Sequence, residues 1–390
     1  QRSTRTQDGG RGHSHVTESI REPKCDTRPE PGSQGSQTST GADGTTGGIV
    51  QPISRPAWAL RSALAVAVLI ILAFGVGIQT QVMSRQQELR VTLTARDMVQ
   101  TRRFLIPHFL DEPRLQKPPL MYWIVAGVYE TTGALWSPGA ARFPTVVALG
   151  FLGALLYGYA LREGQRRLGL FAAGILVTFM LIQRLGRQAE TDIALILFVS
   201  LTVLTAVTGL RTGKTVPWLL AGLFMGMGFM TKGLAGVAMP AVAVLTLGLW
   251  ERRFRKQHVP AVALALLLAA CIGLPWYAYL RYGSGVPQET QAILSKEVDA
   301  IASSGRHTGS WFYYFLRLPA VTLPWSAALI LGVFDGWRKR RDEPLARMAL
   351  AWLASTVLVL SCLHQKQGHY MLLAMPPAAL ITAWWCQRTL

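Results

Sequence analysis

Residues 258–279 read HVPAVALALLLAACIGLPWYAY. No Lys, Arg, Asp or Glu interrupts this stretch, and its length of about 20 residues is what an α-helix needs to cross a hydrocarbon core of ~30 Å. Inside lipid such a run must be helical, because only a helix satisfies all of its own backbone hydrogen bonds. Runs of the same kind recur along the chain, which predicts an all-α polytopic membrane protein.

Outward from this stretch, hydropathy predicts about ten transmembrane helices. The apolar stretch 120–128 is too short to cross and is followed closely by Glu130, so we expect an interfacial or re-entrant helix there. The predicted spans are residues 58–80, 143–161, 168–183, 192–210, 216–231, 234–250, 258–279, 318–334, 348–363 and 370–387.

The composition fits a membrane protein and argues against a nucleic-acid binder. Hydrophobic residues make up 50% of the chain and charged residues only 15%, which is a lower charged share than soluble domains have. The formal net charge is 39 − 21 = +18. This charge lies in short loops between apolar segments, where the enrichment of cytoplasmic loops in Lys and Arg explains it without a nucleic-acid partner.

The basic loops also predict the orientation of the chain. Every second short loop is strongly basic, and the positive-inside rule places these loops in the cytoplasm. Residues 1–57 are rich in Gly, Ser, Thr, Gln and Pro, so we expect a disordered cytoplasmic tail ahead of a membrane-embedded domain at 58–390. The basic residues that set this orientation include Arg162, Arg166, Arg167, Arg211, Lys214, Arg252, Arg253, Arg255, Lys256, Arg338, Lys339, Arg340, Arg341 and Arg347.

The same rule places a first outer loop at 81–140 and a second at 280–317. The short segments around 184–191, 232–233 and 364–369 are expected on this outer face as well. The first outer loop is itself basic, which orientation counting does not explain. Binding of an anion by this loop does explain it.

A lysine beside two prolines is the strongest local signal in the first outer loop. The sequence Leu115-Gln-Lys-Pro-Pro-Leu120 holds Lys117 in an extended turn directly before an apolar helix. An ammonium held there can meet a phosphate at the membrane surface. The alternative is a lysine whose stem lies along the apolar surface while its charge reaches the interface. The motif alone leaves both readings open.

An ordered set of motifs resembles the protein-mannosyltransferase-like glycosyltransferases, glycosyltransferase family 39, which include the lipid A aminoarabinose transferases. The resemblance covers about residues 58–387, and the order of the motifs is more specific than any one of them. The motifs are Gln87-Glu-Leu-Arg90, Ala95-Arg-Asp-Met98, Pro107-His108, Gln116-Lys-Pro-Pro119, Tyr122-Trp123, Ala141-Arg-Phe-Pro144, Arg187-Gln-Ala-Glu-Thr-Asp192, Gly228-Phe-Met-Thr-Lys-Gly233, Pro275-Trp-Tyr277, Arg306-His307, Leu323-Pro-Trp325 and Lys366-Gln-Gly-His-Tyr370.

The resemblance implies a membrane-embedded fold of the GT-C type, with an outer-face loop domain that roofs a cavity. It implies sugar transfer from a polyprenyl-phosphate donor to a lipid, glycan or protein acceptor at the periplasmic face of the cell inner membrane, among membrane lipids. Relatives often continue with more spans or an outer domain, so we expect the protein to extend beyond Leu390.

The reaction needs cations for the leaving phosphate and a carboxylate for the acceptor's proton. On the outer face the cationic candidates are Arg90, Lys117, Lys232 and Lys366. The carboxylate candidates are Glu88, Glu190 and Asp192. The resemblance adds His307, His369 and Tyr370 as substrate-binding candidates.

The sequence departs from the family pattern at Gln87, where many members have Asp, and at Gln116, where many have Glu. An amide cannot take a proton from a hydroxyl. Either Glu88 serves instead, or the acceptor is acidic enough to need no base, or the protein is inactive; we favour Glu88. The two amides also weaken the case for a divalent cation, because hard cations prefer carboxylates. We predict no metal site, although a divalent cation is left open.

A multi-pass transporter or flippase for a lipid-linked or anionic solute is the alternative function. Transporters place charged residues near the membrane midplane and often contain internal repeats. Here the predicted spans are nearly free of charge, no repeat is visible, and the polar residues collect at one face. This pattern favours an interfacial enzyme.

Overall fold

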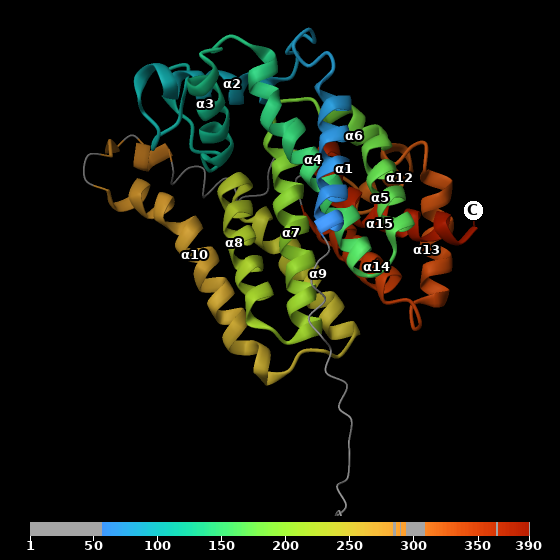
Figure 1. The fold of residues 1–390 in the computed structure, drawn as a ribbon. Coiled ribbons are helices and arrows are strands. Elements are labelled where there is room, and N and C mark those ends of the chain that lie inside the picture. The colour runs from blue at the N-terminus through green and yellow to red at the C-terminus, as the bar shows by residue number, and fades with distance from the viewer. Residues whose placement is uncertain (1–56, 284–285, 289, 294–308, 364–365, 390) are drawn as a thin grey trace, which may run out of the picture. The chain divides into compact units, whose positions relative to one another are not determined.

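The computed structural model describes residues 57–283, 286–288, 290–293, 309–363 and 366–389. Nearly all of the predicted tail, much of the second outer loop and His307 lie outside these residues. The regular structure of the described chain is helical except for one short hairpin (Figure 1). Its elements are α1 (Ala57–Gly75), α2 (Gln86–Thr101), β1 (His108–Phe109), β2 (Glu112–Pro113), α3 (Leu120–Thr132), α4 (Pro138–Arg162), α5 (Arg166–Thr178), α6 (Met180–Leu185), α7 (Thr191–Thr212), α8 (Thr215–Lys232), α9 (Ala235–Trp250), η1 (Lys256–His258), α10 (Val259–Tyr282), α12 (Tyr313–Val321), α13 (Ser326–Lys339), α14 (Pro344–Cys362), η2 (Gly368–Ala374) and α15 (Met375–Thr389).

The chain is a multi-pass membrane protein, but the count of about ten spans is not confirmed. Five helical segments in the described residues are long and apolar enough to cross a bilayer, and the number is six if α12 and α13 together form one bent span. The five are α1, α4, α7, η1 with α10, and α14. Several of the other predicted spans correspond to helices that are shorter or less apolar.

The predicted span at 168–183 is broken into α5 and α6 at Phe179. A break inside an apolar segment exposes backbone groups that need hydrogen-bond partners. The N–H of Met180 donates to the carbonyl of Leu323 at 2.9 Å, a partner supplied by the segment between α12 and α13. Hydropathy does not reveal this break, because apolar residues continue on both sides of Phe179.

Two later predicted spans also change direction or helix type. The stretch 318–334 is divided between α12 and α13, which are bent by 119°. Pro324 lies in the connection, where a proline ring cannot continue the preceding helix. The stretch 370–387 starts in the 3₁₀-helix η2 and becomes α15 at Met375, with Pro376 and Pro377 in the first turn, the part of a helix that tolerates proline.

The first outer loop folds into a small unit of two helices and a hairpin. Its strands β1 and β2 are antiparallel, with His108 opposite Pro113. Helix α3 includes the predicted short helix at 120–128, and it is not among the segments long enough to span. Helices α2 and α3 share a hydrophobic core that contains Val91, Ala95, Met98, Tyr122, Val125 and Tyr129.

Helix α7 lies inside the bundle, in contact with α4, α8, α9 and η2 (Figure 1). Helix α8 in turn packs closely on α9 and α10 through small residues. A Cβ added to Gly222 would lie 2.3 Å from the carbonyl oxygen of Ala265, and one added to Gly236 would lie 2.1 Å from the backbone of Gly228. Small residues let membrane helices approach this closely, so larger side chains at these positions would push the helices apart.

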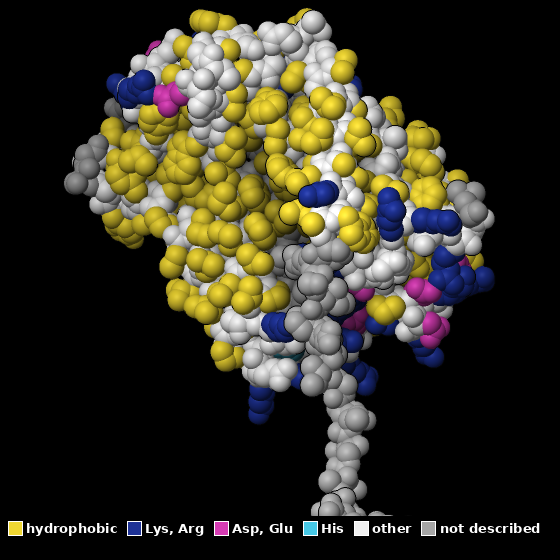
Figure 2. All heavy atoms as spheres, in the orientation of Figure 1, with side chains coloured by type: hydrophobic (Ala, Val, Ile, Leu, Met, Phe, Trp, Pro, Cys, Tyr) yellow, Lys and Arg dark blue, Asp and Glu magenta, His cyan; other side chains and the backbone are white. Residues whose placement is uncertain are grey.

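The outer surface of the bundle is hydrophobic, as a lipid-facing surface must be. Figure 2 shows apolar side chains spread over the face formed by α8 and α10, with Lys and Arg gathered along its lower edge. Exposed leucines on α10 include Leu264, Leu267 and Leu274. A surface of this kind is stable in contact with lipid and would promote aggregation in water.

Candidate functional site

Polar side chains gather where the first turn of α7 meets the C-terminal end of α8 and the start of η2. The Lys232 Nζ at the end of α8 lies 2.5 Å from the Asp192 Oδ1 of α7 and 4.8 Å from the centroid of the Tyr370 ring of η2. The Lys117 Nζ, from the first outer loop, donates to the Thr191 Oγ1 at 3.2 Å. The structure thus brings together four segments that the sequence predicted to share one face.

Lys117 is partly buried and has only neutral hydrogen-bond acceptors among the described residues. Its Nζ donates to the Thr191 Oγ1 and, at 3.4 Å, to the Gln87 Oε1. Burial and, to a lesser extent, the neighbouring charge of Lys232 lower the pKa of Lys117 to about 8, against the opposing effect of Asp192. An ammonium in this position is destabilised by its surroundings and would gain from an anionic partner.

Asp192 and Lys232 form an ion pair with both side chains mostly shielded from solvent. The carboxylate lies in the first turn of α7, where the helix dipole favours negative charge. The ammonium lies in the last turn of α8, where the dipole favours positive charge. The two helix ends therefore help to hold both charges at this boundary.

Glu190 is a second carboxylate of the cluster, directly before α7. Its Oε1 accepts from the Arg85 Nε at 2.6 Å, which ties the residue to the start of α2. Burial raises the pKa of Glu190, whereas the hydrogen bond from Arg85 opposes the shift. The charge of Asp192 also raises this pKa, so the two carboxylates interact.

His369 completes the cluster from the η2 side and stacks edge-on against Tyr370, with 4.7 Å between the ring centroids. Burial lowers the pKa of His369 to about 4. Asp192 opposes this shift, and the positive charges of Lys232 and Lys117 add to it. The imidazole is therefore neutral at neutral pH and can donate one hydrogen bond and accept another.

Glu88 lies beside this cluster in a closed ion pair with Arg142. The Arg142 Nε and a terminal nitrogen donate to the two carboxylate oxygens at 2.7 and 3.1 Å, and both side chains are only 2% exposed. The backbone N–H of Ala189 donates to the same carboxylate at 3.1 Å. Arg142 also donates to the carbonyls of Ile78 and Gln81. Every polar group of this pair thus has a partner inside the protein.

The predicted site residues divide into three sets. Six of them form the cluster: Lys117, Glu190, Asp192, Lys232, His369 and Tyr370. Three lie in the described chain but outside it. Glu88 is paired with Arg142; Lys366 donates to the carbonyls of Ser361 and Leu363 at the end of α14; and Arg90 makes no hydrogen bond or ion pair within the described residues. The last, His307, lies outside the described residues.

Sequence reasoning did not single out four polar residues that shape the cluster. Arg85 binds Glu190, Thr191 accepts from Lys117, and Arg142 binds Glu88. The fourth, Arg114, is buried, and its Nε donates to the Tyr122 hydroxyl at 3.0 Å. A charged residue at the start of an apolar helix was the available signal for Arg142. The pairings of Arg85, Thr191 and Arg142 join residues 54 to 105 positions apart and left no local signal, whereas Arg114 and Tyr122 are 8 positions apart.

No group of three or more His, Cys, Asp or Glu residues in the described parts of the chain could hold a metal ion. The carboxylates of the cluster are instead paired with Arg85 and Lys232. The chemistry that these residues can offer is that of fixed cations beside carboxylates, which suits an anionic group.

Comparison with known sequences finds similarity to the same family that the sequence motifs resemble. The model of the family described as dolichyl-phosphate-mannose-protein mannosyltransferase matches residues 116–277. An undecaprenyl phosphate-alpha-4-amino-4-deoxy-L-arabinose arabinosyl transferase of Sodalis glossinidius is 29% identical over 325 residues, 81% of this chain and 57% of that protein. A relative of the same description from Erwinia tasmaniensis is 29% identical over 83% of this chain and 59% of its own length. The chain therefore spans less than two thirds of these relatives.

Comparison with solved structures shows the same fold. The crystal structure of ArnT from Cupriavidus metallidurans bound to undecaprenyl phosphate matches with a TM-score of 0.72 and 18% identity, over 86% of this chain and 61% of that one. The Archaeoglobus fulgidus oligosaccharyltransferase in its apo form matches with a TM-score of 0.56 and 10% identity, over 84% and 50% of the two chains. Together with the ordered motifs, the family model and the relatives show that the chain is similar to glycosyltransferase family 39, the protein-mannosyltransferase-like glycosyltransferases, and the solved structures show that it has their GT-C type of fold.

Proposed function

We propose that this chain is the membrane domain of a transferase that moves a sugar from a polyprenyl-phosphate donor to a lipid, glycan or protein acceptor. The relatives named above are arabinosyl transferases that use an undecaprenyl phosphate donor. By analogy the donor here carries an aminopentose or a related sugar, and the acceptor is a lipid at the membrane surface. The cluster at the start of α7 is the active site of this reaction.

Lys117 is the observation that carries the proposal. Within the described residues it has neutral partners, Gln87 and Thr191, and its pKa is lowered to about 8 by burial. A partly buried cation without a direct counter-ion is costly to keep in a folded protein, so it calls for an anionic ligand. A lipid phosphate at the end of the helices meets that need. The neutral Gln87 leaves the positive charge of Lys117 available for the phosphate, whereas an aspartate at this position would neutralise it.

The reaction breaks the bond between the anomeric carbon of the sugar and the phosphate oxygen, and it forms a bond from that carbon to the acceptor oxygen. Lys117 and Lys232 stabilise the negative charge left on the polyprenyl phosphate. Glu190, whose pKa is raised by burial, receives the proton of a hydroxyl acceptor. Asp192 positions Lys232 through their ion pair. If the acceptor is itself a phosphate, its oxygen is already anionic and the base is not required.

Glu88 takes a different role from the one expected of a catalytic base. Both of its oxygens accept from Arg142, and one of them also accepts from Ala189. Both oxygens of this carboxylate are thus engaged by donors inside the protein, so neither is free to accept the proton of an acceptor hydroxyl. Glu88 therefore acts by joining α2, α4 and the segment before α7, which positions Glu190 and Asp192.

The proposed location is the cell inner membrane, with the cluster on the periplasmic side. The basic residues at the other end of the helices lie in the cytoplasm by the positive-inside rule, and so does the tail at 1–57. Labelling with a membrane-impermeant maleimide tests this. In a protein without its native cysteines, Ser137→Cys is expected to react in intact cells, and Gly213→Cys only after lysis.

Sugar transfer in membranes that contain the full-length protein tests the function. Radiolabelled sugar is supplied on polyprenyl phosphate, and wild type is compared with Asp192→Asn and with Asp335→Asn as the matched control. Asp335 pairs with Lys339 on α13, away from the cluster, so its loss is expected to leave transfer unchanged.

Loss of labelled product with Asp192→Asn alone would support both the reaction and the site. Equal loss with both variants would point to a general defect in folding. Donor uptake without formation of a glycosylated product, with the protein folded, would favour the transporter alternative.

A further inference from the structure

A second polar cluster lies at the opposite end of α7. Arg211 is in the last turn of this helix, and Asp192 is in its first turn. With about 1.5 Å of rise per residue, the 22 residues of α7 separate the two ends by roughly 30 Å, which is close to the thickness of a hydrocarbon core. The second cluster therefore belongs to the other membrane face. None of its residues takes part in the proposed transfer.

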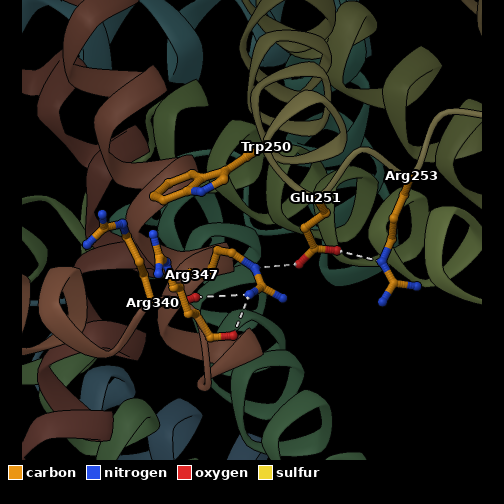
Figure 3. Close-up of a pocket in the computed structure, with 6 residues that line it drawn as sticks. Trp250, Glu251, Arg253, Arg340 and Arg347 are labelled. Carbon is orange, nitrogen blue, oxygen red and sulfur yellow. Dashed lines mark hydrogen bonds and ion pairs between the residues drawn. The ribbon is translucent and has the colours of Figure 1, made fainter.

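The centre of this cluster is Glu251, whose side chain is 2% exposed. Its Oε1 accepts from a terminal nitrogen of Arg211 at 3.2 Å and from the Arg347 Nε at 3.0 Å. The Arg253 Nε lies 3.0 Å from the Oε2 (Figure 3). This network joins the ends of α7, α9 and α14, so one acid is shared among three arginines.

A cavity of about 420 Å³ opens beside Glu251, and Figure 3 shows side chains that line it. Four arginines and one glutamate line it, so the formal charge of the lining is 4 − 1 = +3. The side chain of Arg341 makes no hydrogen bond or ion pair within the described residues, and the guanidinium of Arg340 donates only to the backbone of Trp337 there. The cavity is lined by Trp250, Glu251, Arg253, Arg340, Arg341 and Arg347.

Aromatic and aliphatic surface adjoins the cationic cavity. Trp250 in the wall contacts Trp337, with 5.7 Å between ring centroids, and Arg340 stacks over the Trp337 ring at 4.2 Å. On the same helix as Trp337, Phe334 and Ile330 are exposed at helical spacings that place them on one side. Trp and Arg beside exposed apolar side chains are typical of the membrane–water interface.

We propose that this cavity binds the phosphate group of an anionic membrane lipid in the leaflet opposite the transfer site. The unpaired arginines receive the phosphate, since guanidinium groups match its geometry and charge. The acyl chains lie along the exposed apolar side of α13. A bound lipid would add a counter-ion to a cluster that has too few acids, and so would fasten α9, α13 and α14 together at this face.

Lipid binding to the purified full-length protein in neutral detergent tests the proposal. The probe is dioctanoyl-phosphatidylglycerol, with dioctanoyl-phosphatidylcholine as the uncharged control and glycerol 3-phosphate as the phosphate without tails. Wild type is compared with Arg340→Gln/Arg341→Gln. Removal of these two positive charges is expected to weaken phosphatidylglycerol binding about 30-fold. Arg341→Gln alone, which breaks no hydrogen bond within the described structure, is expected to weaken it several-fold.

A matched double variant distinguishes binding in the cavity from general attraction of the lipid to the positive charge at this end of the helices. Arg166→Gln/Lys214→Gln removes two charges at the same end of the helices but outside the cavity, and it is expected to leave the affinity within about 3-fold of wild type. An equal loss with this control, or no loss with Arg340→Gln/Arg341→Gln, would overturn the site. Glycerol 3-phosphate that binds as tightly as the lipid would overturn the lipid assignment. Binding is measured without the donor, so the result does not depend on the transfer reaction.

Discussion

Two buried pairs of opposite charge lie close together on the site-bearing face, and they are built differently. Glu88 and Arg142 form a closed pair: the carboxylate binds the guanidinium through both oxygens, and Arg142 also donates to two backbone carbonyls. Asp192 and Lys232 form an open pair, with a single short contact between one carboxylate oxygen and one ammonium. Lys117 lies near the open pair without a direct counter-ion in the described chain.

The difference separates a structural role from a chemical one. In the closed pair every donor and acceptor is used inside the protein, so none is free to bind a substrate. Removal of one partner would leave a buried unpaired charge and destabilise the fold. The open pair and Lys117 carry charge that the protein itself does not fully balance. Substrate binding and catalysis are expected at a buried polar network whose charge the protein leaves incompletely balanced.

Removal of one partner of the closed pair is expected to have the largest effect. Arg142→Met leaves the Glu88 carboxylate buried without its guanidinium, which costs about 3–5 kcal/mol in unfolding free energy. The thermal midpoint and the yield of monodisperse protein in detergent report this loss. The double variant Glu88→Leu/Arg142→Met is expected to recover most of it, because no unpaired charge remains. A double variant no more stable than Arg142→Met would mean that the pair is not the closed structural unit described.

Removal of the unbalanced cation is expected to reduce transfer while the fold is kept. Lys117→Met should lower the transfer rate about 10²–10³-fold, the size of effect seen when one charge-stabilising donor is lost. The same variant should be as stable as wild type or more stable, because a poorly matched charge is gone. Initial rates and thermal midpoints are measured together, with Lys339→Met on α13 as the control. Unchanged rates with Lys117→Met would remove the basis for the proposed site.

The pH dependence of transfer should report Lys117 directly. Its pKa of about 8 means that the ammonium is mostly charged at pH 7 and loses its proton as the pH rises through 8. Donor affinity should therefore be steady between pH 6.5 and 7.5 and fall about 10-fold for each pH unit well above 8. An ordinary lysine would give no fall until above pH 10. His369, with a pKa of about 4, should add no change above pH 6.

Measurement of kcat/KM from pH 6.5 to 9.5 checks this prediction. Lys117→Arg should flatten the profile, because a guanidinium stays charged throughout the range. A fall that persists in Lys117→Arg would assign the titration to another group.

The smallest effect is expected at Lys366, which sequence reasoning grouped with the substrate-binding residues. Its ammonium donates to the carbonyls of Ser361 and Leu363 at 2.7 and 2.9 Å, so it caps the end of α14. Lys366→Met should cost about 1 kcal/mol of stability and change transfer by less than 3-fold. A large loss of transfer without loss of stability would return Lys366 to the substrate-binding set.

Much of the site was predictable because its residues stand at the ends of apolar segments. Asp192 and Lys232 each border a charge-poor run, and the alternation of basic loops put both on one face. Lys117 was marked by the two prolines that follow it. The role of Glu88 was not predictable, because it depends on Arg142, which is 54 residues away and lies next to Glu88 only in the tertiary structure.

The sequence by itself determined that this protein is helical and embedded in a membrane, since long uncharged runs leave lipid as their only stable surroundings and the helix as their only stable form. It also determined which segments would share a face, because charge at loop positions sets orientation. Only the tertiary structure decided where apolar segments break, as at Phe179, and which acids are closed by a partner and which stay open. Those outcomes depend on contacts between residues far apart in the chain, and hydropathy and local motifs carry no information about such contacts.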